Sequence, residues 1–297
     1  MKLVVGVAPV KLSALVCTHN DEARLADCLR RLDFCDEVVV VADRCTDRSQ
    51  EIARQFGARV IDGIFPLESQ RKAAGVSACL GEWVLEVEPD EQVAAPLAYE
   101  VRAAIHGRPG GDWFDVPIDN FVGQTLVRRG WGAGLGEVAA PRLYRRRVKR
   151  WTARRVEPAA ILDGRFAGAL ETPLTRHADP DVGHMVARLN RQTALRAQDL
   201  ADAGDGGGLF GDLLGALGRF WTCYIWRQGV REGELGFLIA LLAGLDAVLS
   251  GLRARTLIKA RAAAAAAGAA PPGRMGVAGR RSPPARPGAV VSWNVAR

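Results

Sequence analysis

The 297-residue sequence lacks several patterns that define common protein classes. Its six cysteines include no CxxC pair, which argues against a zinc site or a disulfide framework and favours buried thiols in a reducing compartment. No Gly-rich loop with a lysine follows the first expected strand, which argues against a nucleotidyltransferase that cradles a triphosphate. No internal repeat is present. The apolar opening run is broken by Pro9 and Lys11, so we expect no secretion signal and a cytoplasmic protein.

The composition is that of a folded protein with an excess of positive charge. Hydrophobic residues make up 48% and charged residues 25% of the chain. The net charge of +7 predicts anionic partners, such as phosphate-bearing ligands or an acidic membrane surface.

The first 93 residues alternate between strand and helix patterns. Short apolar runs predict strands at 12–17, 37–42, 58–62 and 82–87, and helical spacing predicts helices at 20–34, 51–57 and 68–81. Asp47 and Gln50 resemble a capping box at the start of the second helix. This order predicts an α/β fold with a Rossmann-like, mostly parallel sheet flanked by helices.

Polar residues follow three of the expected strands. Because the carboxyl ends of parallel strands meet at one edge of a sheet, we expect these side chains to converge there. The stretch "LEVEPDEQV" is the most unusual, since carboxylates this close repel one another unless a cation joins them. The expected ligand-binding residues at this edge are Thr18, His19, Asn20, Asp21, Asp43, Arg44, Glu88 and Asp90.

The remainder of the chain divides into three parts. Residues 108–175 show no regular periodicity and include the basic run "RLYRRRVKRW", whereas 181–202 predicts a helix. Two apolar blocks follow at 209–226 and 235–252, and a low-complexity segment from about 262 predicts disorder. We therefore expect a folded domain over 1–178, with an alternating half over about 12–95 and an irregular half over about 96–178, then a helical region over 179–261 and a disordered tail over 262–297.

Several motifs resemble those of the family 2 glycosyltransferases of GT-A fold, and most closely the bacterial lipopolysaccharide-core glucosyltransferase group. "THNDE" stands where that group has a "TYNEE"-like turn, and "VVADRCTDRS" where it has "VVDSGSTDRT". "QRKAAGVSACLGEWVL" matches its third helix and fourth strand, "EPDE" occupies the place of its "DADE" motif, and "LNRQT" is also similar. The resemblance covers about residues 12–260 and is most specific in the first 95.

The resemblance implies an inverting, metal-dependent transferase that takes a sugar from a nucleotide diphosphate, here a UDP-sugar. Asp90, with Glu88, would hold Mg²⁺ or Mn²⁺, because such cations prefer carboxylate oxygens. Asp43 would bind the base and Arg71 would steady the base or diphosphate. Thr18, Asn20 and Glu22 would complete the donor site.

The sequence departs from the family pattern at several of these positions. Glu88 replaces the first aspartate of the acidic motif, and Lys72 stands where the family usually has Asn. The family's His-Glu pair corresponds to "RVEP" here, which places Glu157 at the His position. Glu157 is therefore the expected catalytic base, with Glu137 as the alternative.

Other functions are also compatible with these patterns. A non-catalytic nucleotide-sugar-binding or scaffold protein with a degraded metal site would keep the same fold. The basic run from Arg142 to Arg155 could bind nucleic acid, but no nucleic-acid-binding motif accompanies it, so we expect an anionic glycan, a lipid-linked acceptor or a bilayer. We read His177 and His184 as ordinary residues and His19 as structural or donor-lining.

The apolar block 235–252 is barely long enough to span a bilayer, which needs about 20 residues. It contains Asp246, and a carboxylate at a membrane centre costs about 2.5–3.5 kcal/mol. With aromatic residues in the preceding block and arginines around both, the pattern predicts peripheral attachment to the inner face of the cytoplasmic membrane. A packed helical pair within a soluble domain is the alternative.

Overall fold

A computed structural model of the protein describes residues 11–106, 110–132 and 134–266. The chain forms two compact units. Of the described residues, the first unit contains 11–106, 110–126 and 137–180, and the second contains 127–132, 134–136 and 181–266.

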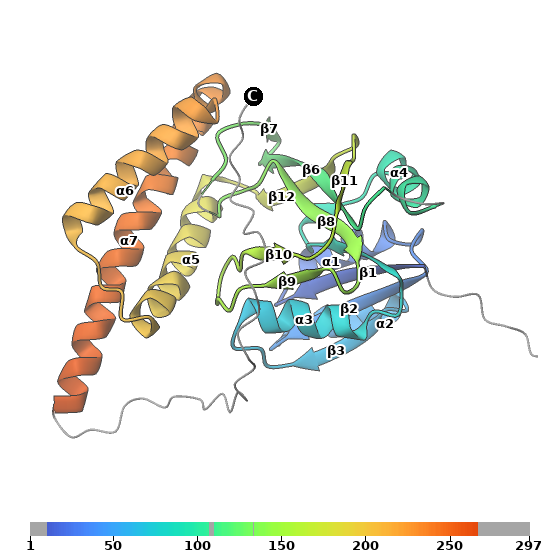
Figure 1. The fold of residues 1–297 in the computed structure, drawn as a ribbon, viewed down its shortest axis with the longest axis horizontal. Coiled ribbons are helices and arrows are strands. Elements are labelled where there is room, and N and C mark those ends of the chain that lie inside the picture. The colour runs from blue at the N-terminus through green and yellow to red at the C-terminus, as the bar shows by residue number, and fades with distance from the viewer. Residues whose placement is uncertain (1–10, 107–109, 133, 267–297) are drawn as a thin grey trace, which may run out of the picture. The chain divides into compact units, whose positions relative to one another are not determined.

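The first unit begins with the predicted alternation of strands and helices (Figure 1). Its parallel strands pair in the order β3-β2-β1-β4. The strands are β1 (Leu12–Thr18), β2 (Glu37–Asp43), β3 (Arg59–Gly63) and β4 (Trp83–Val87), and the helices are α1 (Glu22–Arg30), α2 (Ser49–Gln55) and α3 (Glu68–Ala78). The prediction of a mostly parallel α/β sheet flanked by helices is confirmed.

The region without clear periodicity is rich in strands. The sheet continues β4-β8-β6-β12-β5, with β7 and β11 also paired to β6, and β9 and β10 form a separate antiparallel pair. The elements are β5 (Glu91–Gln92), α4 (Ala95–Ile105), β6 (Trp113–Val122), β7 (Thr125–Val127), β8 (Ala139–Arg145), β9 (Lys149–Trp151), β10 (Ala160–Leu162), β11 (Phe166–Ala169) and β12 (Leu174–Asp179). Sequence periodicity missed these strands because several are short and their pairing is set by distant partners.

Hydrophobic residues cover both faces of this sheet. Alternate residues of β1 point to opposite sides, so Ala14 and Val16 pack with α1, α2 and α4, whereas Leu15 packs with α3. A side chain at Gly75 of α3 would lie 2.4 Å from Leu15, so the glycine allows α3 to approach the sheet closely. Burial on both faces explains the uninterrupted apolar strands of the sequence.

The predicted capping box at the second helix is wrong. Asp47 Oδ1 does accept a hydrogen bond from the Ser49 amide at 3.0 Å. Gln50, however, donates its side-chain amide to Asp62 at 2.9 Å instead of returning to the start of its own helix. The side chain therefore joins α2 to β3.

The second unit is mainly helical over residues 182–266. Helices α5 (Val182–Asp202) and α6 (Leu209–Trp221) both pack against α7 (Gly233–Ala266), and short π and 3₁₀ turns lie at Thr222–Trp226 and Gly229–Glu232. A side chain at Gly251 of α7 would clash with Asp212, so glycine allows α6 and α7 to approach closely. Helix α7 extends to Ala266, past the predicted start of the disordered tail, and residues 267–297 lie outside the described residues.

The segment Gly229–Ala266 is long and apolar enough to cross a membrane, with a mean hydropathy of 2.1 over its best window. Half of that window is buried within the structure, as is common for a core helix of a soluble protein. Asp246 is fully buried in it and is paired with Arg196 of α5 and Arg219 of α6. The carboxylate that disfavours a membrane span is thus the polar centre of a helical bundle.

Candidate donor and acidic-motif site

Asp43 lies at the carboxyl end of β2 and is almost fully buried. Its carboxylate accepts two hydrogen bonds from Arg44, each of 2.9 Å, and one of 3.0 Å from the Phe65 amide. Burial raises the pKa of Asp43, but these hydrogen bonds and the charges of Arg44 and Arg71 outweigh it, so the pKa lies below its usual value. Asp43 is therefore a charged acceptor at the sheet edge.

The loop after β1 is held to the start of α2 by side-chain acceptors. Asn20, which has a left-handed φ of 60°, accepts a hydrogen bond of 2.8 Å from the Thr46 amide. Glu22 accepts one of 2.9 Å from the Arg48 amide, and Thr18 donates its hydroxyl to Asp21 at 2.8 Å. Three of the expected donor-site residues therefore shape the two loops that border Asp43.

Arg71 projects from α3, and its Nε atom is buried and makes no hydrogen bond to the described residues. Its charge also contributes to the lowered pKa of Asp43. An unpaired buried donor is costly in a folded protein unless a ligand or water meets it. Arg71 and Asp43 thus combine a free cationic donor with an anionic acceptor at the edge of the sheet.

The acidic motif forms a tight turn between β4 and β5. The Glu91 amide donates to the Glu88 carbonyl at 2.9 Å, and the Glu91 carboxylate accepts the Glu88 amide at 2.8 Å. Asp90 is fixed from the other side, because its carbonyl accepts the His177 amide of β12 at 2.9 Å. The turn therefore presents its carboxylates in set directions.

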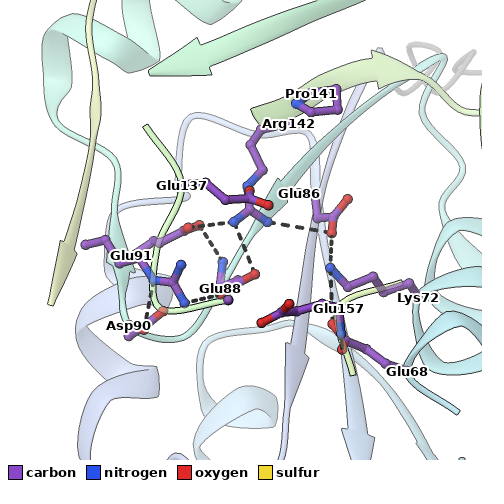
Figure 2. A network of polar contacts seen from close by, with 12 residues as sticks. Glu68, Lys72, Glu86, Glu88, Asp90, Glu91, Glu137, Pro141, Arg142 and Glu157 are labelled. Carbon is purple, nitrogen blue, oxygen red and sulfur yellow. Dashed lines mark hydrogen bonds and ion pairs between the residues drawn. The ribbon is translucent and has the colours of Figure 1, made fainter. Parts of the chain in front are cut away.

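Two arginines from distant strands pair with this turn. Arg142 of β8 pairs with both Glu88 and Glu91 (Figure 2), at distances of 3.1 Å and 2.8 Å. Arg176 of β12 donates through Nε to Asp90 Oδ2 at 3.2 Å and through Nη2 to Glu88 Oε2 at 3.0 Å. Burial raises the pKa of Glu88, but the two guanidinium groups outweigh it and hold the pKa well below its usual range.

A second group of charges is centred on Glu86 of β4, on the other side of Arg142 from Glu91 (Figure 2). Its carboxylate is 2.7 Å from both Lys72 of α3 and Lys149 of β9, and Tyr144 donates its hydroxyl to it at 3.2 Å. Burial lowers the pKa of Lys149 to about 8. Lys72, which replaces the family's usual Asn, thus has a partner on β4.

Asp90 offers one carboxylate oxygen to which a divalent cation could bind. Asp90 Oδ1 is buried and has no hydrogen-bond partner among the described residues, so one hard oxygen is available. Glu88 is the more open of the two carboxylates, with its side chain 32% exposed. No cluster of three or more potential metal ligands exists in the described part of the chain, so Asp90 and Glu88 would supply only part of a coordination shell.

The two candidate bases lie on different sides of this network, and both are labelled in Figure 2. Glu157 has a left-handed φ of 49°, and its amide donates to Glu68 of α3 at 3.1 Å. Glu137 is exposed next to β8, and its carbonyl accepts the Asn120 side chain at 2.8 Å. A non-glycine residue in the left-handed region is strained, and such strain is frequent at functional sites.

A cavity of about 290 Å³ opens beside Asp90. Its walls come from α1, the acidic turn, the loop after β6 and the end of β12. The polar residues that line it include Arg24, Asp27, Gln92, Gln124, His177 and Asp179. His177, which we expected to be an ordinary residue, therefore borders this cavity, where its ring stacks on Phe121 at 4.9 Å.

The basic run was expected to face anionic partners, and for two of its members this is wrong. Arg142 and Lys149 are only 3% and 7% exposed and pair with the carboxylates of β4 and β5. Arg176 was not singled out at all. Residues 140–144 of β8 are all buried, so both faces of this strand are covered and Arg142 needs a buried partner. The charged run shows no alternation that could have revealed this.

A mostly parallel sheet with hydrogen-bonding groups at its carboxyl edge defines the α/β class of proteins, many of which bind nucleotides at that edge. Residues 13–152 match the family model described as Glycosyl transferase family 2. This part of the chain is a family 2 glycosyltransferase domain.

The chain is similar to several named proteins. It is 34% identical over 93 residues to an uncharacterized glycosyltransferase of Rickettsia typhi, a match that covers 31% of this chain and 32% of the relative. It is 24% identical over 278 residues to the lipopolysaccharide core biosynthesis glycosyltransferase LpsC of Rhizobium meliloti, covering 86% of this chain and 96% of the relative. The alignment thus spans about a third of the Rickettsia relatives.

Among solved structures, S. aureus TarS is similar over 84% of this chain and 55% of its own, with 14% identity and a TM-score of 0.45. A complex of the Mycobacterium tuberculosis glucosyl-3-phosphoglycerate synthase with Mn²⁺, UDP and glucosyl-3-phosphoglycerate is similar over 39% of this chain and 46% of its own. The identity there is 19% and the TM-score 0.32.

Proposed function

We propose that the protein is an inverting, metal-dependent glycosyltransferase that moves a sugar from a UDP-sugar to a cell-envelope glycan or lipid-linked acceptor. The observation that carries the proposal is the family 2 domain with Asp43, Arg71 and Asp90 at the ends of its strands and helices. The envelope acceptor rests on the similarity to LpsC, which covers most of both chains.

Each donor-site residue has a chemical role in this proposal. The Asp43 carboxylate would accept the N3–H of a uracil base, and the free Nε of Arg71 would donate to the base or diphosphate. Asn20, Thr18 and Glu22 would keep the bordering loops in place. Asp90 and Glu88 would hold Mg²⁺ or Mn²⁺, which would offset the negative charge on the departing diphosphate.

The transfer itself needs a base. A carboxylate would take the proton of the acceptor hydroxyl, the oxygen would attack the anomeric carbon, and the bond from that carbon to the diphosphate would break. Glu157 is our proposed base, with Glu137 as the substitute. The cavity beside Asp90, which has polar walls but is lined by neither glutamate, would receive another part of the acceptor.

The proposed location is the inner face of the cytoplasmic membrane. Helix α6 buries none of its residues, although it is largely apolar. Phe210 is 74% and Leu217 is 63% exposed, and Trp226 beyond the helix is 77% exposed. The nearby Arg227 and Arg231 are also exposed and would meet anionic headgroups.

A donor screen tests the proposed activity. The full-length protein should be stabilised against heat by UDP-sugars in the presence of Mn²⁺, more than by GDP- or dTDP-sugars, and should hydrolyse or transfer the bound sugar. Binding without any turnover would favour a non-catalytic nucleotide-sugar-binding protein. No binding of any nucleotide sugar would refute both.

A further inference from the structure

Arg176 pairs with the Asp90 and Glu88 carboxylates, next to the unpaired Asp90 oxygen that an incoming cation would use. Strand β12 pairs antiparallel with β5, in a register that sets Arg176 opposite Glu91. Its guanidinium therefore reaches across the turn to one oxygen of Asp90 and one of Glu88. The side chains of Arg176 and Asp90 are only 14% and 15% exposed, so water screens this pair poorly.

The acidic motif is neutralised from within the protein. The four carboxylates between residues 86 and 91 are paired with four cationic side chains from other elements: Lys72, Arg142, Lys149 and Arg176. Lys72 and Lys149 pair with Glu86, and Arg142 pairs with Glu86, Glu88 and Glu91. Of these four cations, only Arg176 contacts the Asp90 carboxylate among the described residues. Only Arg176 thus lies on the carboxylate that has a free oxygen.

A divalent cation bound to Asp90 and Glu88 would lie next to the Arg176 guanidinium. Like charges at this distance repel, so a cation that arrives without an anion would bind Asp90 Oδ1 against the charge of Arg176. It would have to displace the guanidinium to use Asp90 Oδ2 or Glu88 Oε2 as well. A nucleotide diphosphate changes the balance, because its phosphate oxygens give Arg176 a new acceptor when it leaves Asp90. Binding of the cation and of the diphosphate would then be coupled.

We infer that Arg176 is a positioning residue that keeps the acidic motif closed to free divalent cations and opens it when a nucleotide diphosphate binds. This inference rests on the proposed function for the identity of the anion. It follows that UDP should raise the affinity for Mn²⁺, and that Mn²⁺ should raise the affinity for UDP by the same factor. Couplings of this kind are typically about 5- to 150-fold.

The experiment measures Mn²⁺ binding to the full-length protein by electron paramagnetic resonance of the free ion, with and without UDP. In Arg176→Gln, Mn²⁺ alone should bind at least about tenfold more tightly than in the wild type, and the effect of UDP should shrink. Arg176→Lys keeps the charge but has only one ammonium group to place. Its Mn²⁺ affinity should therefore lie between those of the wild type and Arg176→Gln. Arg24→Gln is the matched control, since Arg24 and Asp90 line one cavity but Arg24 donates to the Ala178 carbonyl.

The outcomes separate this inference from the proposed function. Unchanged or weaker Mn²⁺ binding in a folded Arg176→Gln protein would overturn the role of Arg176. If Arg176→Gln does not fold, Arg176→Lys decides, and wild-type Mn²⁺ affinity in that variant would overturn it equally. A wild type that fails to bind UDP with or without metal would instead refute the proposed donor, whereas the Mn²⁺-only comparison would still test Arg176.

Discussion

Arg44 donates two hydrogen bonds of 2.9 Å to Asp43, its neighbour in the chain, from Nε to Oδ1 and from Nη2 to Oδ2. The pairing requires a left-handed backbone at Arg44, with φ of 51°. Asp43 is 6% exposed and Arg44 is 52% exposed at the side chain, so the arginine covers the carboxylate from the solvent side. A uracil base that bound Asp43 would therefore have to share the carboxylate with Arg44.

Asp43→Ala should raise the donor KM. A hydrogen bond between a neutral base and a carboxylate is worth about 1.5–3 kcal/mol, which corresponds to a roughly 10- to 150-fold loss of affinity. Arg44→Ala removes the covering side chain but leaves the acceptor, so it should change the donor KM much less. Steady-state kinetics on both variants checks this. Unchanged donor affinity in Asp43→Ala with lower thermal stability would show a purely structural turn residue.

Asp90→Asn should lower kcat by about 100-fold or more, because the substitution removes a charged ligand while preserving shape. Glu88→Asp restores the aspartate that the related group has at this position, so that variant should keep or gain activity. Circular dichroism should show both proteins folded. Near-normal activity of Asp90→Asn at limiting metal would contradict the assignment of the metal site.

Glu157→Gln should mainly lower kcat, by about 10²- to 10⁴-fold, with donor binding preserved, because a general base acts only on the chemical step. Glu137→Gln is the matched comparison, since it makes the same exchange on the other candidate. Single-turnover measurements with saturating donor distinguish the two. A silent Glu157→Gln with an inactive Glu137→Gln would transfer the role to Glu137.

Asp115 gives the protein a specific dependence of stability on pH. Burial, with a smaller contribution from Glu137, raises its pKa from 3.8 to about 6, although Lys149 acts in the opposite direction. The folded state therefore holds the proton more tightly than the unfolded state. This contribution is fully present below pH 3.8 and is lost as the pH rises through about 6.

Asp115→Asn should remove this dependence and raise the free energy of unfolding at pH 7 by up to about 3 kcal/mol relative to the wild type. Urea denaturation at pH 4 and pH 7 measures the difference between the two proteins. Asp163→Asn is the control, because that side chain is 49% exposed. A wild type whose stability relative to Asp115→Asn is the same at both pH values would show that Asp115 is charged in the fold throughout.

Helix α6 should bind lipid through its exposed apolar face. Leu217→Glu, at a position 63% exposed, should weaken binding to vesicles that contain phosphatidylglycerol by about tenfold or more, since a buried leucine contributes about 1.5–3 kcal/mol. Leu195→Glu on α5 makes the same exchange at a 38% exposed position and should have less effect. Vesicle flotation at low and high salt provides the measurement, and the wild type should bind less in high salt. A wild type that never floats with vesicles would rule out the attachment.

The amino-acid sequence by itself determined the order of strands and helices in the first half of the first unit. Uninterrupted apolar strands that alternate with amphipathic helices define a parallel sheet, and parallel strands place their carboxyl ends at one edge. The positions of Asp43, Asn20 and the acidic turn therefore followed from their places at the ends of β1, β2 and β4. Local spacing carries this information because each residue lies at the end of its own strand.

Only the tertiary structure decided which cations meet the acidic turn. Arg142 and Arg176 are 51 to 88 residues away in the chain from the carboxylates they bind. Their positions depend on the pairing of β8 with β4 and of β12 with β5, and a one-residue change of register would turn each side chain to the other face of the sheet. Such long-range pairing has no local periodicity, so a basic run that resembled a charged surface proved to supply two buried counter-ions of the sheet.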